Sequence, residues 1–452
     1  MKRKVSVFAA ICLIFTLLVT ACGSSKNEQN QAATGSSPEP SSAQPSTAAA
    51  TSEATPATPT IKGKITFVNS RVDFEDKFKE IAAAFKAKYP EAEVDVELVK
   101  EIDQVLKIRL ASDEAPDVFQ YTTNIIPAGS DKLAEYLLPL DDMGYTKDTI
   151  AFYDLPYHMY EGKHYGLTEG VYVTGILASK KVLESVGVTT YPKTLDELYA
   201  LADKLKAKGI VPFGSMLKSG WPLGSWNAVA FANLTGTVDD FYKQMNESDT
   251  PFALDTPLGK AFSFVRALKD KGYFDEDLMS SDWDVLRLHM DKVGMLMLAN
   301  YGIGALEGLD PKDVAFFPLP IDNSGTPIAQ RNSSWDIGIS KNTKNPETAK
   351  AFVKFLLEES GYADLVGEAP SVASVGSKNP ALNEFLQQNI KYVDSTSSDS
   401  KIYGRYQEIM NKAQINEGMI YQDVLMNKDS DIKPVLDKYN KKFADSRKAS
   451  GK

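Results

Sequence analysis

The segment from residue 65 to residue 119 alternates strand-like and helix-like patterns, and this alternation limits the possible folds of the chain more than any other feature. Residues 65–68 form a β-rich run, residues 74–85 repeat apolar side chains on one helical face, and residues 94–98 alternate apolar and polar side chains. A second helical pattern over residues 102–110 and a third strand-like run from Asp117 follow. Strands joined by helices of these lengths predict a parallel α/β sheet with helices on both faces.

Polar side chains follow the first and third of these strands. Asn69, Ser70 and Arg71 come after the first strand, and Gln120 and Tyr121 come after the third. Sheets of this kind bind ligands beyond the carboxyl ends of their strands. We therefore expect these residues to line a ligand site.

The start of the chain has a different composition from the rest. Lys2, Arg3 and Lys4 precede an apolar run over residues 5–21, which ends at Cys22 and is short for a membrane span. The pattern resembles a bacterial lipobox. It predicts that residues 1–21 are a signal peptide and that Cys22 carries a lipid such as palmitate, the alternative being a generic signal peptide with an incidental cysteine.

Residues 23–60 consist almost entirely of Ser, Ala, Thr, Pro, Gln, Asn and Glu, without an aromatic or large aliphatic side chain. Such a segment buries too little apolar surface to offset its conformational entropy. We expect residues 22–60 to form a lipidated, disordered stalk. The folded part would then lie on the extracellular face of the cell membrane, held there by the lipid anchor alone.

Charge and residue content argue against several classes of function. The chain has 50 Lys and Arg against 60 Asp and Glu, a formal net charge of −10, which argues against a nucleic-acid partner. None of the three histidines has metal-ligand spacing to another histidine or cysteine, so we expect no metal. Gly302, Gly304 and Gly308 do not match the spacing of a dinucleotide-binding loop, and we expect no cofactor.

All four tryptophans lie in polar or glycine-rich surroundings. Trp221 and Trp226 share one such stretch, Trp283 follows a Ser-Asp pair, and Trp335 precedes Asp336. A sugar ring has an apolar CH face and a rim of hydroxyl groups, which suits an aromatic ring beside amides, carboxylates or arginine. The pattern favours carbohydrate binding, and the alternative is that these rings pack loops onto the core.

Five segments, read in order, resemble the extracellular solute-binding proteins of sugar ABC importers, the group that includes the maltose-binding protein. They are residues 85–90 (FKAKYP), 110–119 (LASDEAPDVF), 162–167 (GKHYGL), 192–198 (PKTLDEL) and 339–347 (ISKNTKNPE). The resemblance implies two doubly wound α/β lobes of the type II periplasmic-binding-protein-like architecture, joined by a hinge of three chain crossings.

The resemblance also implies where the lobes lie. Lobe 1 is expected in residues 61–169 plus 320–368, and lobe 2 in residues 170–319 plus 369–452. The crossings are expected near residues 169–172, 317–320 and 368–371.

In this family the ligand lies between the lobes, and hinge closure creates the form that the permease recognises. Carried over to this chain, the resemblance adds Tyr172, Asn300, Tyr301 and Asp336 to the candidate ligand residues. The chain has Ile303 where the family often has a sugar-stacking tryptophan, so Tyr301 or a loop tryptophan would supply the platform.

The expected function is therefore capture of a sugar or oligosaccharide, without chemistry, and its delivery to an ABC permease by a monomeric binding protein. Two alternatives stay open. One is a binding protein for another solute, such as a peptide, a polyamine or an oxyanion. The other is a surface-anchored glycan-degrading enzyme that uses a pair of carboxylates.

Overall fold

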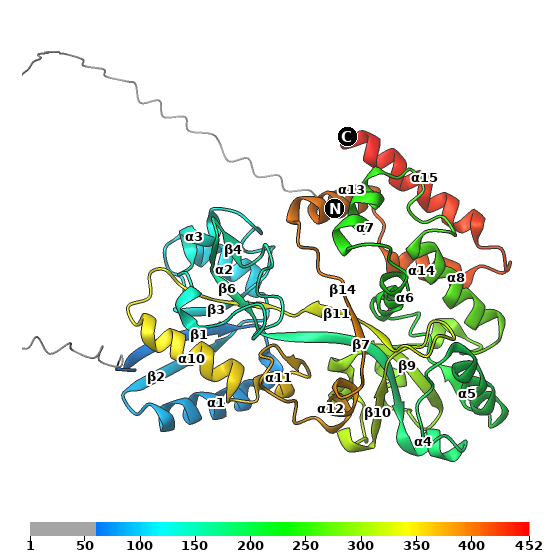
Figure 1. Ribbon diagram of the computed structural model, residues 1–452, viewed down its shortest axis with the longest axis horizontal. Helices are drawn as coiled ribbons and strands as arrows, with labels where there is room; N and C mark the ends of the chain where they lie inside the picture. Colours follow the sequence, from blue (N-terminus) through cyan, green and yellow to red (C-terminus); the bar gives the residue numbers. More distant parts are fainter. Residues whose placement is uncertain (1–59, 452) are drawn as a thin grey trace, which may run out of the picture. The chain divides into compact units, whose positions relative to one another are not determined.

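The structure is a computed structural model that describes residues 60–451, so the expected signal peptide, Cys22 and residues 23–59 of the stalk lie outside the described residues. The described residues form two large β-sheets with their helices (Figure 1). We call the first sheet with its helices lobe 1 and the second lobe 2. None of the described helices combines the length and the apolar character needed to cross a membrane.

Lobe 1 is built on a five-stranded sheet in the order β2-β1-β3-β12-β6. The strands are β1 (Gly63–Asn69), β2 (Ala92–Leu98), β3 (Val118–Tyr121), β6 (Gly166–Thr168) and β12 (Asp336–Ile339). Strand β1 pairs in parallel with β2 and with β3, which confirms the prediction from residues 65–119. Strand β12 is antiparallel to both β3 and β6.

Helices cover both faces of this sheet. They are α1 (Glu75–Lys88) and α10 (Pro346–Glu358) on one face, and α2 (Ile102–Ala111) and α3 (Lys132–Tyr136) on the other (Figure 1). Side chains of β1 alternate between the two resulting cores, with Phe67 packed in the core that holds Phe85 and Phe352, and Val68 in the core that holds Leu106. Because β1 and β3 are parallel, their carboxyl ends lie at one edge of the lobe, and the helices hold the sheet on both faces.

Lobe 2 is built around β7, the longest strand. Its sheet has the order β14-β11-β7-β9-β8, and β10 and β13 also pair with β7. The strands are β7 (Gly170–Ser179), β8 (Val211–Phe213), β9 (Val293–Ala299), β10 (Val314–Phe317), β11 (Ile328–Ser333), β13 (Ala369–Pro370) and β14 (Lys391–Asp394). Strands β9, β10, β11 and β13 all run antiparallel to β7.

The two faces of this second sheet also carry separate cores. Ile176 and Met297 lie in the larger core, and Leu177 and Leu298 lie in the smaller one. The larger core is covered by α4 (Lys180–Ser185), α5 (Leu195–Ala207), α6 (Asn227–Ala232), α7 (Val238–Glu247), α8 (Pro257–Asp270), α13 (Ser400–Ala413), α14 (Glu417–Met426) and α15 (Lys433–Ala449). The smaller core is covered by α9 (Trp283–Leu286) and α12 (Pro380–Leu386).

The helix boundary predicted at residues 194–197 is present. The Glu197 amide donates to the Thr194 hydroxyl at 3.2 Å, and the Thr194 amide donates to the Glu197 carboxylate at 3.2 Å. These reciprocal bonds form the capping box that begins α5.

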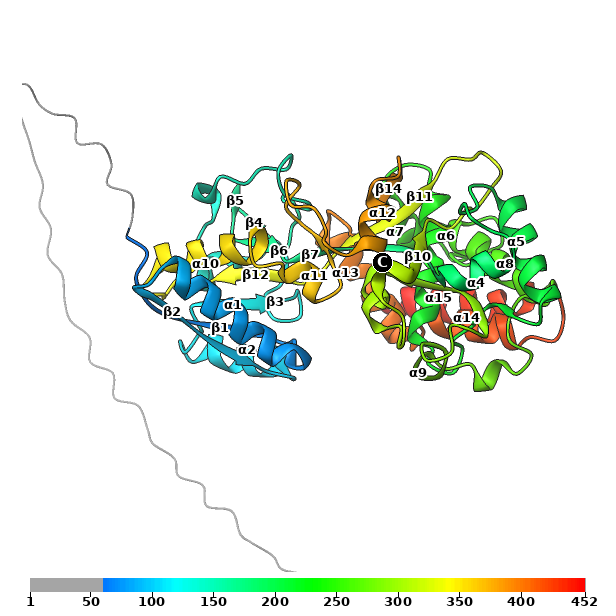
Figure 2. The same cartoon turned by 90° about the horizontal axis from the view of Figure 1, so that it is seen from below.

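The chain passes between the two sheets at three places, which Figures 1 and 2 show around β6, β7 and β11. Glu169 separates β6 from β7, and residues 334–335 separate β11 from β12. The third passage runs from α11 (Tyr362–Leu365), whose side chains pack in the core of lobe 1, to β13.

The second passage differs from the expected position near residues 317–320. Both β10 and β11 pair with β7, so the chain leaves the second sheet only at Ser334. Pro318 and Pro320 end β10 because proline has no N–H to donate to a strand pairing. The chain then turns back into the same sheet as β11. The crossing expected near residues 317–320 is therefore a reversal within lobe 2.

Candidate functional site

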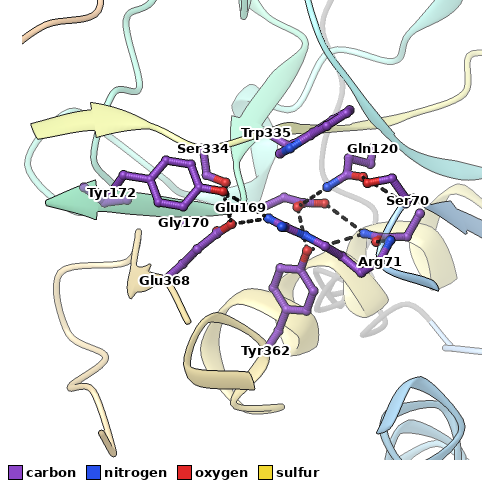
Figure 3. A network of polar contacts seen from close by, with 12 residues as sticks. Ser70, Arg71, Gln120, Glu169, Gly170, Tyr172, Ser334, Trp335, Tyr362 and Glu368 are labelled. Carbon is purple, nitrogen blue, oxygen red and sulfur yellow. Dashed lines mark hydrogen bonds and ion pairs between the residues drawn. The ribbon is translucent and has the colours of Figure 1, made fainter. Parts of the chain in front are cut away.

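Polar side chains from all three crossings meet in one partly buried network, which we call the crossing network (Figure 3). Its members are Asn69, Ser70, Arg71, Gln120, Glu169, Tyr172, Ser334, Tyr362 and Glu368. The Arg71 guanidinium forms an ion pair with the Glu368 carboxylate and donates to the Tyr172 hydroxyl at 3.3 Å. The same carboxylate accepts hydrogen bonds from Tyr172 at 2.9 Å and Ser334 at 2.6 Å. The network therefore joins the end of β1 to the second and third crossings.

Glu169 is the second carboxylate of the network and belongs to the first crossing. It is buried, and it accepts hydrogen bonds from Gln120 Nε2 at 2.7 Å and from the Tyr362 hydroxyl at 2.6 Å. Asn69 Nδ2 lies 3.4 Å from the same carboxylate. Asn69 and Gln120 are themselves fully buried, so they hold Glu169 in position and have no surface available to a ligand.

Burial changes the ionisation of both carboxylates. Burial and the neighbouring charge of Glu368 raise the pKa of Glu169 to about 8, although Tyr362, Arg71 and Gln120 oppose the shift. The pKa of Glu368 is also raised by its burial, against the opposing charge of Arg71. Near neutral pH the network therefore holds one ion pair, Arg71 with Glu368, beside a largely protonated Glu169.

We expect these raised pKa values to make the protein less stable as the pH rises. An unfolded glutamate titrates near pH 4.3. Because the folded-state pKa of Glu169 is higher, its contribution to stability is fully present below the unfolded pKa and is lost as the pH rises to about 8. Glu169→Gln should flatten this decline without abolishing it, because Glu368 contributes in the same direction.

The check is the free energy of urea unfolding at about pH 5, 7 and 9. Glu80→Gln is the matched control, because Glu80 is exposed on α1, where it pairs with the exposed Lys77. An equally steep decline in Glu169→Gln and in the unmodified protein would contradict the assignment.

Tyr172 also belongs to a group of rings in lobe 2, which we call the aromatic face: Tyr172, Trp221, Trp283 and Tyr301. The Tyr172 and Tyr301 rings meet edge to face, with centroids 5.4 Å apart. Trp221 lies 6.2 Å from Tyr301 and 6.1 Å from Trp283. Trp221 is 54% exposed, so its ring is available to a ligand.

One cavity borders the aromatic face through Trp221, and a second cavity shares Glu417 with it. The polar cavity, of about 330 Å³, has walls from both lobes, with Tyr157 from lobe 1 and Asn227, Gln330, Asn332, Ser395, Gln407 and Glu417 among its lobe 2 residues. The Trp221 cavity, of about 440 Å³, is lined by Trp221, Asn416, Glu417 and Gln422 among others. Glu417 lines both cavities, so the two cavities are neighbours.

The strand pairing links the polar cavity to the aromatic face. Asn332 of β11 lies opposite Tyr172 of β7. Paired residues on neighbouring antiparallel strands have side chains on the same face of the sheet. Asn332 of the polar cavity and Tyr172 of the aromatic face therefore lie on the same face of the lobe 2 sheet.

Five residues expected from sequence lie where a ligand could reach them. Arg71, Tyr172, Tyr301 and Trp335 are partly exposed and Trp221 is exposed. Figure 3 shows Trp335 at the edge of the crossing network, and the backbone carbonyl of Trp335 accepts a hydrogen bond from the Glu169 amide at 2.9 Å. The structure thus brings the strand-end arginine, the crossings and the aromatic face together.

Trp226 and Asn300 require a correction, because both are fully buried inside lobe 2. The Trp226 ring packs against Phe213 and Phe274 at centroid distances of 5.9 and 6.1 Å. The Asn300 side chain accepts from the Val173 amide at 2.9 Å and donates to the Val171 carbonyl at 3.2 Å. Both side chains therefore stabilise the lobe itself and cannot contact a ligand in this structure.

Tyr121 and Asp336 are also buried, in lobe 1. The Tyr121 hydroxyl donates to the Tyr157 carbonyl at 3.1 Å, and the Asp336 carboxylate lies 2.8 Å from Nε2 of the buried His158. These contacts support the loop that carries Tyr157 into the polar cavity. Their role is to position that loop, which differs from the expected direct contact with a ligand.

Glu169 and Glu368 were not singled out from sequence as functional residues, although both lie in expected crossing segments. Each is the only charged residue in a stretch of small and apolar residues, 166–178 and 365–376 respectively. A lone carboxylate in such a stretch is a usable signal, because buried charges in proteins are almost always paired. The residues of the polar cavity gave no comparable signal.

Comparisons with known proteins agree with this architecture. Residues 71–363 match the family described as bacterial extracellular solute-binding protein. The chain is 24% identical over 326 residues to the multiple sugar-binding protein of Streptococcus mutans, a match that covers 70% of this chain and 76% of that protein.

Solved structures show the same fold at low sequence identity. One is a binding protein of an ABC transporter from Bifidobacterium animalis subsp. lactis in complex with mannobiose, at 22% identity and a TM-score of 0.65, covering 86% of this chain and 95% of that chain. Another is the apo-form of RafE from Streptococcus pneumoniae, at 21% identity and a TM-score of 0.69, covering 86% and 99%. Because the family match covers more than half of its residues, the chain belongs to the bacterial extracellular solute-binding proteins.

Proposed function

We propose that this protein binds a sugar or oligosaccharide between its lobes and delivers it to an ABC permease, without catalysing a reaction. One observation carries the proposal: the exposed ring of Trp221 lines one cavity, and the neighbouring cavity, which shares Glu417 with it, is lined mainly by amide and hydroxyl side chains and includes Tyr157 of lobe 1. Aromatic rings match the CH face of a sugar, and amides and hydroxyls match its rim.

The charge of the site favours binding over hydrolysis. Glycosidases use a pair of carboxylates on either side of the bond that they cleave. Among the described residues that line the two cavities, Glu417 is the single carboxylate. The crossing network has two carboxylates, but both are buried and bonded to protein groups.

The known relatives support a carbohydrate ligand. The Streptococcus mutans relative is named a multiple sugar-binding protein, and similar solved structures contain mannobiose, mannotriose or raffinose. Delivery to a permease is proposed for the same reason, because two of these structures are of a protein described as a binding protein of an ABC transporter.

Calorimetric titration with a panel of mono- and oligosaccharides tests the proposal, with peptides and polyamines as the competing ligand classes. We expect saturable binding of one saccharide class. Trp221→Ala should weaken that binding by about 1–3 kcal/mol, because the exposed ring supplies apolar area and stacking.

Leu254→Ala is the matched control, since Leu254 is an exposed apolar residue of lobe 2 that lines neither cavity. It should leave the affinity unchanged. A folded protein that binds peptides or polyamines and no saccharide would refute the proposed ligand class, and unchanged sugar affinity in Trp221→Ala would refute the role of the ring.

We also propose that the protein acts as a monomer on the extracellular face of the membrane, anchored by a lipid on Cys22. The leader supports the anchor, and the polar cavity supports the monomer because one chain supplies both of its walls. Cells that incorporate labelled palmitate into the protein, but not into a Cys22→Ser variant, would agree with the anchor. Equal labelling of both would refute it, and a dimer in sedimentation equilibrium would refute the monomer.

A further inference from the structure

Glu417 is shared by the polar cavity and the Trp221 cavity. It is the first residue of α14 and follows the N-cap residue Asn416. It lines both the polar cavity and the Trp221 cavity, and every other residue between 60 and 451 that lines either of them is uncharged. A saccharide that stacks on Trp221 and extends to Asn332 would therefore pass the carboxylate of Glu417.

The surroundings of Glu417 hold its carboxylate in place without neutralising it. The hydroxyl of the buried Tyr406 donates to one carboxylate oxygen at 2.5 Å. This is the single side-chain hydrogen bond of Glu417 within residues 60–451, where no Lys, Arg or His side chain forms an ion pair with it.

Building on the proposed function, we propose that Glu417 determines ligand specificity by accepting hydrogen bonds from the hydroxyl or amino groups of a saccharide and by excluding acidic saccharides. A carboxylate accepts charge-assisted hydrogen bonds from hydroxyl donors and binds an ammonium group more strongly still. A ligand carboxylate would lose its hydration and meet a like charge, and none of the described residues that line the cavities is basic and could compensate. The ligand class is thus neutral or amino saccharides.

The neighbouring tyrosines suit this role. Burial, reinforced by the charge of Glu417, raises the pKa values of Tyr406 and Tyr421 well above their usual range. Both hydroxyls therefore keep their protons at physiological pH. Tyr406 remains a donor to Glu417, and the free carboxylate oxygen remains an acceptor for the ligand.

The test is a titration series with three probes of similar length: a neutral manno- or raffinose-type oligosaccharide, a galacturonic acid trisaccharide and a glucosamine trisaccharide. The full-length protein should bind a neutral or amino saccharide and reject the galacturonic acid trisaccharide. Glu417→Gln should lower the affinity for the bound saccharide by about tenfold, the scale of one charged hydrogen bond. It should also remove any preference for the amino sugar and reduce the discrimination against the acidic one.

Two further variants keep the result interpretable. Glu417→Asp retains the charge and should still reject the acidic probe, even if its affinity for the bound saccharide falls. Glu408→Gln removes an exposed carboxylate of α13 that lines neither cavity, and it should change nothing. Thermal unfolding of each variant shows that it is folded.

The outcomes separate this proposal from the proposed function. In one outcome the unmodified protein binds a saccharide, and Glu417→Gln binds it with the same affinity and rejects the acidic probe equally well. This result would overturn the role of Glu417 and leave the proposed function intact. Tight binding of the acidic probe by the unmodified protein would overturn it as well. Binding of no saccharide at all would overturn both proposals.

Discussion

Replacement of Trp226 by alanine should lower the free energy of unfolding by about 3–5 kcal/mol, the scale for removing a buried tryptophan. The Trp226 side chain is fully buried and packs against Phe213, Phe264 and Phe274. Truncation would remove these contacts and leave a cavity that the rigid neighbours cannot fill. Urea unfolding, followed by circular dichroism, measures the change.

Trp221→Ala is the matched control for this experiment, because the two tryptophans lie at opposite ends of one short 3-10 helix, η3 (Trp221–Trp226). Trp221 is 54% exposed, so its loss should change stability by less than about 1 kcal/mol. The two variants should therefore separate stability from sugar affinity. A Trp226→Ala protein as stable as the unmodified one would show that this ring does not lie in the core.

Replacement of Glu368 by alanine should also destabilise the protein by about 3–5 kcal/mol, because it leaves the Arg71 guanidinium without its counter-charge. The Glu368 side chain is 0% exposed and that of Arg71 is 21% exposed. Tyr172 and Ser334 would lose their acceptor at the same time. Denaturant unfolding at neutral pH measures the loss.

The exposed pair Lys77 and Glu80 on α1 provides the control, since its two side chains are 54% and 66% exposed. Glu80→Ala should cost no more than about 1 kcal/mol, because water screens a surface ion pair. The double variant Arg71→Ala with Glu368→Ala should recover part of the loss, since it no longer buries an unpaired charge. A cost for Glu368→Ala as small as that for Glu80→Ala would show that the crossing network does not hold the crossings together.

These experiments address different parts of one arrangement. Trp226 belongs to the core of lobe 2, Glu368 joins the crossings, and Trp221 and Glu417 belong to the surface proposed to bind the ligand. Tyr172 belongs to both the crossing network and the aromatic face. We therefore expect a ligand bound at that face to affect the hinge through Tyr172. Loss of affinity in Glu368→Ala beyond its effect on folding would measure this coupling.

Much of the fold could be predicted from the sequence, because helix and strand periodicities and caps are local. The alternation over residues 65–119 predicted the parallel part of the first sheet, and Thr194 with Glu197 predicted the start of α5. The same local patterns placed Arg71 just beyond β1, where the structure joins it to the crossings.

The rest depended on contacts between distant parts of the chain. Arg71 and Glu368 are 297 residues apart, and Trp221 and Trp226 have similar local sequences but opposite exposures. A local pattern states that a residue is aromatic or charged, but not which neighbours remove it from water. The sequence alone thus determined the layers, the strand ends and the family resemblance. Only the tertiary structure decided which tryptophan is accessible, where the second crossing lies and that Glu417 lines two neighbouring cavities, because burial and pairing arise when remote segments pack together.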